Sequence, residues 1–290
     1  GIANVPLISK KFADGELYVQ IQQSIRGCDV FLVQPTCAPV NDSLMELMIM
    51  VDACKRASAR QITAVIPYYG YARADRKTSG RESITAKLTA NLLEKSGVDR
   101  VLAMDLHSAQ IQGYFDIPCD HIYGSPVLID YLETLNLEEV VVVSPDVGGV
   151  ARARAFAKQM KDAPLAIIDK RRAAHNIAES LTVIGEVKGK TAILIDDMID
   201  TGGTICSGAR LLKQEGAKRI FACASHAVFS PPSYERLSAE NLFEQVIVTN
   251  SIPVLVKNNF PQLKVLSVAN MLGEAIWRIH EESSVSSMFR

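Results

Sequence analysis

Short, continuously apolar runs alternate along the chain with longer segments in which apolar residues recur at helical spacing. The runs expected to form strands are Val30–Val33, Ile62–Ile66, Val101–Met104, Val140–Val143, Leu165–Ile168, Ala192–Ile195, Ile220–Ala224, Val246–Thr249 and Val265–Val268. The helices expected between and after them cover residues 43–58, 82–96, 150–160, 204–216 and 271–281. Runs without polar alternation are typical of parallel strands that are buried on both faces. The pattern therefore predicts an α/β protein with parallel sheets.

Local signals refine the limits of these elements. Ser43 and Glu46 have the spacing of a capping box, which predicts that a helix begins there. Gly216 follows the last periodic residue of another helix and is a stop signal. Gly124 and Pro126 interrupt the chain between two stretches with the same order of strand, polar loop and helix. We therefore expect two similar doubly wound domains, 1–124 and 125–279, with residues 280–290 packing back on the first.

Composition excludes several classes of function. The 290 residues carry a net charge of -1, so the chain lacks the basic field that non-specific nucleic-acid or membrane binding requires. No apolar run reaches the length of a membrane span. The six cysteines have neither metal-ligand nor redox spacing, which predicts buried free thiols in a reducing compartment. The chain begins at Gly1 without Met and reads like the middle of a longer sequence, so a targeting segment cannot be assessed.

The segment with the most chemical information follows the predicted strand Ala192–Ile195. It contains Asp196, Asp197, Asp200, Thr201, Gly202, Gly203 and Thr204. The glycines and the free amides at the start of a helix form a cradle for an anion. The two leading acids suit sugar hydroxyls, either directly or through a hydrated magnesium ion. Acids beside an anion cradle therefore predict a ligand that has both a phosphate and a polyol.

Further polar loops follow other predicted strands. In open parallel sheets, ligands bind at the carboxyl ends of the strands, where these loops begin. Asp146, Val147, Gly148 and Gly149 follow Val140–Val143, and this loop can offer amides to a diphosphate and a carboxylate to hydrated magnesium. Asp105 and His107 follow Val101–Met104, where i,i+2 spacing predicts that they share one face. The basic triplet of residues 170–172 is either a solvated surface or a mobile clamp for phosphoryl transfer.

Together these segments resemble the ribose-phosphate diphosphokinases. The resemblance covers nearly the whole chain and includes the motifs at 12–16, 71–77, 105–107, 144–149, 169–172 and 196–204. Only the last of these motifs is shared with the phosphoribosyltransferases. The amino-acid sequence of the motifs is similar to that of the phosphate-activated class of plants and cyanobacteria. The resemblance implies two domains of the type I phosphoribosyltransferase kind. It also implies a cytoplasmic or plastid-stromal enzyme that transfers the diphosphoryl group of Mg-ATP to ribose 5-phosphate.

The resemblance also implies roles for individual residues. Lys170 and Arg172 would be catalytic, and Arg172 would bind ribose 5-phosphate together with residues 196–204. The expected ATP contacts are Phe12, Asp14, Gly15, Glu16, Arg73, Ala74, Asp75, Lys77 and His107, although this family often has Gln at position 74. His107 and Asp146 are the expected magnesium ligands, with Asp105, Asp116 and Asp120 as weaker candidates. Ser24 and Arg26, with the serine-rich tail at 283–287, match a site for phosphate and ADP effectors.

Further expectations follow from the same family. Inorganic phosphate would be an activator, and the chain would form a homo-oligomer, with a hexamer as the expected form. The 12–16 loop would reach the ATP site of a neighbouring subunit. Two alternatives remain open from the sequence, namely a phosphoribosyltransferase and a catalytically silent regulatory subunit of the synthetase.

Overall fold

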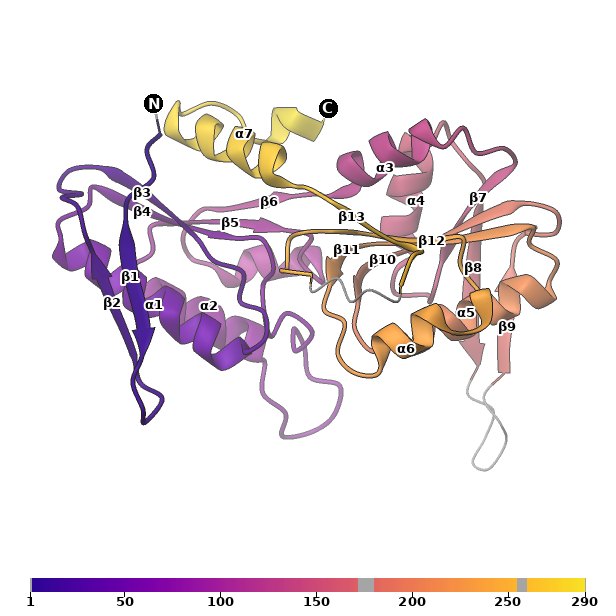
Figure 1. Ribbon diagram of the computed structural model, residues 1–290, viewed down its shortest axis with the longest axis horizontal. Coiled ribbons are helices and arrows are strands. Elements are labelled where there is room, and N and C mark those ends of the chain that lie inside the picture. Colours follow the sequence, from indigo (N-terminus) through magenta and orange to yellow (C-terminus); the bar gives the residue numbers. More distant parts are fainter. Residues whose placement is uncertain (1, 172–179, 255–259, 290) are drawn as a thin grey trace. The chain divides into compact units, whose positions relative to one another are not determined.

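The computed structural model describes residues 2–171, 180–254 and 260–289 (Figure 1). Contacts divide the chain into two units. The first contains the chain up to Tyr123 and again from Ala269, and the second runs from Gly124 to Val268. Each unit has a parallel sheet with its own apolar core. No helix in the described residues is long and apolar enough to cross a membrane.

The first unit is built on a four-stranded parallel sheet. Its strands, in spatial order, are β3 (Asp29–Val33), β4 (Gln61–Ile66), β5 (Arg100–Met104) and β6 (Cys119–Ile122). Helices α1 (Val40–Arg56) and α2 (Thr85–Ser96) cover one face, and α7 (Ala269–His280) covers the other (Figure 1). The unit also has an antiparallel hairpin, β1 (Leu7–Lys11) and β2 (Leu17–Ile21), and two 3-10 turns, η1 (Ala109–Tyr114) and η3 (Ser286–Phe289).

The second unit contains a seven-stranded sheet in the order β13-β12-β11-β10-β7-β8-β9. Its strands are β7 (Val140–Ser144), β8 (Leu165–Arg171), β9 (Ser180–Ile184), β10 (Thr191–Ile199), β11 (Arg219–Ala227), β12 (Gln245–Thr249) and β13 (Leu263–Leu266). All pairs are parallel except β8 with β9. The helical segments are α3 (Ser125–Thr134), α4 (Val150–Gln159), α5 (Gly203–Gln214), α6 (Ser233–Ser238) and the 3-10 turn η2 (Ala239–Asn241).

Alternate residues of the central strands of this second sheet enter two different cores. Leu194 of β10 packs in the core that contains α5 and α6, whereas Ile193 packs in the core that contains α3 and α4. Both side chains are fully buried, as expected of a strand with helices over both of its faces. The predicted α/β fold with parallel sheets is therefore confirmed, and the strand order of the second sheet is doubly wound.

The predicted capping box is wrong. Helix α1 begins at Val40, and the N–H of Ser43 donates to the carbonyl of Pro39 over 3.0 Å, so Ser43 lies inside the first turn. The Glu46 carboxylate instead accepts hydrogen bonds from Ser9 and from Gln34. The two residues have the spacing of a capping box without its geometry, because the helix begins three residues before Ser43 and the N–H of Ser43 is already bonded within the first turn.

Several other expectations need correction. The apolar pattern does not predict the β1–β2 hairpin, β6, α3 or β9, and β13 begins before the expected Val265. The second unit ends at Val268 and not at residue 279, because the whole of α7 packs within the first unit, where Ala275 is buried. His280 at the end of α7 lies 3.4 Å from the Asp29 carboxylate on β3. Cys28 is exposed, which contradicts the expectation that every thiol is buried.

Candidate active site

The order of the second sheet brings two of the predicted loops together. β10 pairs with β7 in parallel, with Ala192 opposite Val141 and Leu194 opposite Val143. The chain leaves β7 towards β8 on one side and leaves β10 towards β11 on the other. Ligands bind at such a switch point, because the two diverging loops leave a crevice at the carboxyl ends of the strands. The loops that follow β7 and β10 are therefore neighbours.

The loop after β10 is an anion cradle with a buried acid beside it. β10 extends to Ile199, beyond the predicted strand, so Asp196 and Asp197 lie on the strand itself, and Asp197 is only 2% exposed. Gly202 has a φ of 74°, a left-handed conformation that favours glycine, and α5 begins at the next residue. Amides in the first turn of a helix lack acceptors within the helix, so those of Gly203 and Thr204 can donate to a bound anion.

The loop after β7 is organised around Asp146. One carboxylate oxygen of Asp146 accepts the N–H of Gly149 over 2.8 Å, and its carbonyl accepts the Ser144 hydroxyl over 2.6 Å. A Cβ atom at Gly149 would lie 2.9 Å from the Ser144 Oγ, so the close approach requires glycine. Asp146, Val147 and Gly148 are exposed, which leaves this loop accessible to a ligand.

The structure changes the interpretation of Asp105 and His107. β5 ends at Met104 and Asp105 has a φ of 39°, so the two residues do not follow strand alternation and the shared-face argument is wrong. A residue of β6 stabilises this turn, because the Nε2 of His121 accepts a hydrogen bond from the N–H of Leu106 over 3.0 Å. Sequence reasoning missed His121, because nothing near it in the chain marks it as a support for His107.

Two of the three weaker metal candidates, Asp116 and Asp120, lie away from the turn that carries Asp105 and His107. Asp120 forms an ion pair with Arg100 at 2.6 Å, and strand alternation places it on the opposite face of β6 from His121. Asp116 is exposed, and its backbone N–H donates to Glu94 over 2.6 Å. Neither position adds a carboxylate to the turn that carries His107.

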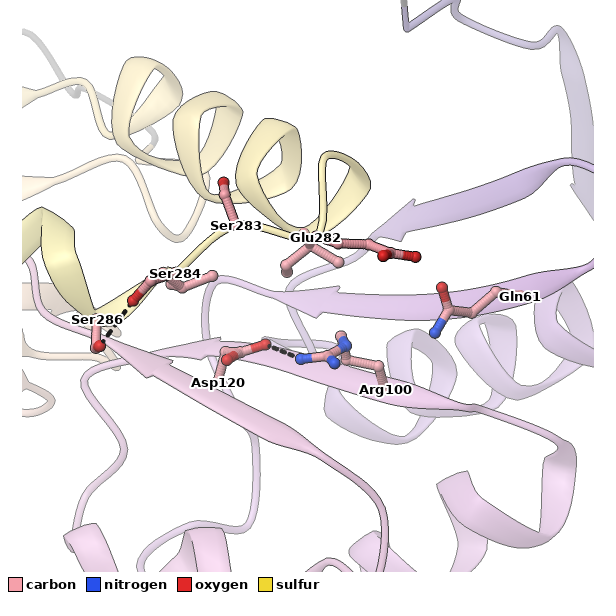
Figure 2. Close-up of a pocket in the computed structure, with 9 residues that line it drawn as sticks. Gln61, Arg100, Asp120, Glu282, Ser283, Ser284 and Ser286 are labelled. Carbon is pink, nitrogen blue, oxygen red and sulfur yellow. Dashed lines mark hydrogen bonds and ion pairs between the residues drawn. The ribbon is translucent and has the colours of Figure 1, made fainter.

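The Asp120–Arg100 pair lies in a partly open cavity that the C-terminal tail lines on one side (Figure 2). This cavity has a volume of about 480 Å³ and is lined by Gln61, Arg100, Asp120, Ile279, Glu282, Ser283, Ser284, Val285 and Ser286. Arg278 holds the tail by donating to the Ser284 carbonyl over 3.0 Å and to the Ser287 hydroxyl. Ser24 and Arg26, the two other predicted effector residues, lie exposed beside a turn at Gly27.

The loop between β4 and α2 presents basic side chains from a constrained backbone. Arg73 and Lys77 are exposed. The N–H and carbonyl of Ala74 are both engaged, with Tyr71 and Ala86 at 3.1 Å each, and the Asp75 carbonyl accepts the Tyr114 hydroxyl. The backbone of Ala74 therefore offers less to a ligand than the sequence suggested.

Glu82 closes the same loop. Its carboxylate accepts hydrogen bonds from the hydroxyl and N–H of Ser79 and from the N–H and hydroxyl of Thr78. These bonds, those from Ser79 foremost, lower the pKa of Glu82 to about 2. Sequence reasoning missed Glu82, whose position three residues after Ser79 gives only a weak signal of a turn.

The predicted adenine loop is the tip of the β1–β2 hairpin. Gly15 has a φ of 98°, and the Phe12 N–H donates to the Glu16 carbonyl over 2.8 Å. The side chain of Asp14 accepts the N–H of Glu16 over 3.1 Å. Phe12 is 46% exposed, with the Lys10 ammonium 5.2 Å from its ring centre. Phe12 is thus partly accessible at the surface of the described unit, with Lys10 over its ring.

The structure does not describe the side chains of Lys170 and Arg172, the two residues predicted to be catalytic. The backbone of Lys170 pairs with Leu181 between β8 and β9. The side chain of Lys170 and the whole of Arg172 are beyond that description. The basic clamp therefore stays a prediction.

The chemistry of the remaining donors fits magnesium. Among the described residues, no group of three or more His, Cys, Asp or Glu side chains is arranged to hold a metal ion. Magnesium that is shared with a triphosphate uses phosphate and water oxygens for most of its ligands and takes only one or two from the protein. Single donors such as Asp146 and His107 are compatible with that mode of binding.

Comparison with known proteins gives a consistent result. Residues 1–97 match the N-terminal domain of ribose phosphate pyrophosphokinase, and residues 171–290 match the phosphoribosyl synthetase-associated domain. A ribose-phosphate pyrophosphokinase from Prochlorococcus marinus subsp. pastoris is 93% identical over the whole chain and 88% of its own length. The corresponding protein from Synechococcus elongatus is 77% identical, again over the whole chain and 88% of its length.

A solved structure agrees with these relatives. The phosphoribosylpyrophosphate synthetase from Mycobacterium smegmatis superposes with a TM-score of 0.91 at 46% identity, covering 97% of this chain and 92% of that one. The match at residues 1–97 includes the Phe12 and Arg73 loops, which a phosphoribosyltransferase would not need. Both findings therefore favour a synthetase over that alternative.

Proposed function

The chain belongs to the ribose-phosphate pyrophosphokinase family, and on that premise we propose how its residues divide the reaction. This activity transfers the β,γ-diphosphoryl group of ATP, as its magnesium complex, to the anomeric hydroxyl of ribose 5-phosphate. The products are phosphoribosyl diphosphate and AMP. The observation that best supports the division is the pairing of β7 with β10, which makes the Asp146–Gly149 loop and the Asp196–Thr204 segment neighbours.

Ribose 5-phosphate is assigned to the second unit. The amides and hydroxyls of residues 200–204 would bind the 5-phosphate at the start of α5. Asp196 and Asp197 would accept hydrogen bonds from ribose hydroxyls, because ionised carboxylates are strong acceptors. The adjacent loop at 146–149 would hold the diphosphate as it forms at the anomeric carbon.

ATP is assigned to loops of the first unit. Phe12 would stack on the adenine, while Asp14, Gly15 and Glu16 would supply polar contacts to it. Arg73, Asp75 and Lys77 would bind the nucleotide, with Ala74 limited to van der Waals contact, because its backbone groups are already used. Exposed cations on a constrained backbone suit a triphosphate, which needs positive charge at fixed positions.

The chemical step is an in-line attack by the anomeric oxygen on the β-phosphorus, with AMP as the leaving group. Magnesium, when bound, neutralises phosphate charge, and His107 and Asp146 are the residues proposed to hold it. Lys170 and Arg172 would stabilise the charge that develops on the transferring oxygens. Positioning and charge neutralisation supply most of the catalysis, so no covalent intermediate with the protein is required.

A direct assay tests this proposal. The purified chain is mixed with ATP, magnesium and ribose 5-phosphate in the presence of inorganic phosphate, and AMP is measured. We expect AMP and phosphoribosyl diphosphate in equal amounts. An absence of AMP would favour the silent regulatory subunit instead.

Regulation is proposed at the C-terminal tail. The cavity lined by Ser284 and Ser286 has many polar groups, and Ser24 and Arg26 are the further residues assigned to phosphate or ADP. Arg26→Ala and Ser286→Ala should each reduce activation by inorganic phosphate without loss of the basal rate. Activation that is unchanged in both variants would contradict this assignment.

Assembly and location complete the proposal. The exposed Leu7, Ile8 and Phe12 on the hairpin support a homo-oligomer in which the hairpin meets a neighbouring subunit, with a hexamer as the proposed form. Light scattering after gel filtration measures the mass, and a monomer would contradict the proposal. The relatives reported above are bacterial, which favours the cytoplasm over a plastid.

A further inference from the structure

One guanidinium group connects the two acids of the proposed ribose site. The Nη1 of Arg152 lies 3.2 Å from the Oδ1 of Asp196 and 3.3 Å from the Oδ1 of Asp197. Arg152 lies in the first turn of α4, the helix that begins directly after Gly149. Its side chain is 28% exposed, so the contact is largely shielded from water. Arg152 therefore joins the helix of the diphosphate loop to the acids at the end of β10.

The acid pair needs a positive neighbour. Burial foremost, and then the adjacent Asp197 carboxylate, raise the pKa of Asp196 to about 8, and the Arg152 charge limits this rise without cancelling it. Besides these groups, β11 presents the buried Cys223 and His226 in register with Ile195 and Met198 of β10. Loss of the Arg152 charge would thus leave two adjacent carboxylates competing for a proton in a poorly solvated place.

We propose that Arg152 is a positioning residue that holds Asp196 and Asp197 in a fixed orientation and favours their ionised forms as acceptors for the ribose hydroxyls. This inference rests on the proposed ribose role of the two acids. An ionised carboxylate accepts hydrogen bonds through both oxygens, whereas a protonated one gives up part of that capacity. A single nitrogen that contacts both carboxylates also fixes their orientation, which charge neutralisation at a distance would not do.

The test compares three variants. Arg152→Met removes the charge, Arg152→Lys retains it without the planar guanidinium, and Arg154→Met makes the same change at an exposed residue of the same helix. In Arg152→Met we expect the KM for ribose 5-phosphate to rise about 10- to 100-fold, the range for a lost hydrogen bond to a charged group. ATP affinity should stay near that of the parent, whereas the melting temperature should fall, because the partly buried acids lose their cation. Arg154→Met should behave like the parent throughout.

The pH profile provides the readout that a purely structural role would not change. The acid limb of kcat/KM for ribose 5-phosphate should move upward by about one to three pH units in Arg152→Met, the shift expected when a nearby opposite charge is lost. In Arg152→Lys the limb should stay near its original place, while KM rises by a smaller factor. An unmoved limb in Arg152→Met, or a loss of ATP affinity as large as the loss of ribose 5-phosphate affinity, would overturn the inference.

Calorimetric binding of ribose 5-phosphate separates this inference from the proposed function. Asp197→Asn should weaken that binding by about 10-fold or more. If Asp197→Asn binds like the parent, the ribose assignment itself fails, and the inference fails with it. If Asp197→Asn loses binding but Arg152→Met does not, the ribose assignment stands and only the role of Arg152 is refuted.

Discussion

The substitution Gly149→Ala tests the geometry of the loop after β7. The added Cβ would lie 2.9 Å from the Ser144 Oγ, a separation that side chains do not tolerate. The hydroxyl cannot move without cost, because Ser144 is fully buried and donates to the Asp146 carbonyl over 2.6 Å. Gly149 has a φ of -82°, so alanine brings no backbone strain and the effect is purely steric.

The magnitude follows from the bond that must break. Leaving a buried hydrogen-bonding group without its partner costs about 1–3 kcal/mol. If this energy is lost from transition-state binding because the proposed diphosphate loop is displaced, kcat/KM falls by about 5- to 150-fold, since each 1.4 kcal/mol corresponds to about a tenfold change in rate. The measurement is AMP release with ATP and ribose 5-phosphate varied in turn.

A second substitution makes the reasoning refutable. Ser144→Ala removes the clashing oxygen, so the double variant Ser144→Ala/Gly149→Ala should recover to within about threefold of Ser144→Ala alone, because the pair is strongly coupled. Gly273→Ala is a matched control, since its Cβ would meet nothing within 4 Å, and it should leave activity unchanged. A double variant as impaired as Gly149→Ala would show that the Ser144 contact is not the cause.

Three further predictions concern other parts of the proposed site. His121→Leu removes the acceptor for the Leu106 N–H, so the magnesium concentration that gives the half-maximal rate should rise several-fold. His107→Ala is the reference variant. An unchanged magnesium dependence in His121→Leu would contradict the role of His121 in supporting the turn that carries His107. Glu82→Gln removes the anionic acceptor of the Thr78 and Ser79 amides, so the hydrogen exchange of these amides should accelerate and the KM for ATP should rise. Unaltered exchange would contradict the role of Glu82 in holding this loop. Lys170→Ala should collapse turnover while ATP binding, measured by calorimetry, persists; an unchanged kcat would remove Lys170 from the mechanism.

The sequence by itself determined the class of fold and the family. Strands that are buried on both faces need continuous apolar runs such as Val140–Val143. Such a run therefore predicts a parallel strand, whatever its place in the order of the sheet. The Asp196–Thr204 segment carries its own chemistry, because an anion cradle at a helix start is made from adjacent residues. Properties that depend on neighbours along the chain can therefore be recognised from the order of the residues.

Only the tertiary structure decided which distant residues meet. The order of strands in the second sheet made the loops after β7 and β10 neighbours, and it placed Arg152 against both acids. The capping-box prediction failed because α1 begins at Val40, and Glu46 bonds to the distant Ser9 instead. The shared-face prediction failed because the chain turns at Asp105, beside the bond from Leu106 to the distant His121. Contacts of this kind depend on strand order and on side chains that cross between elements. The pattern of apolar and polar residues along one chain does not encode either in a directly readable form.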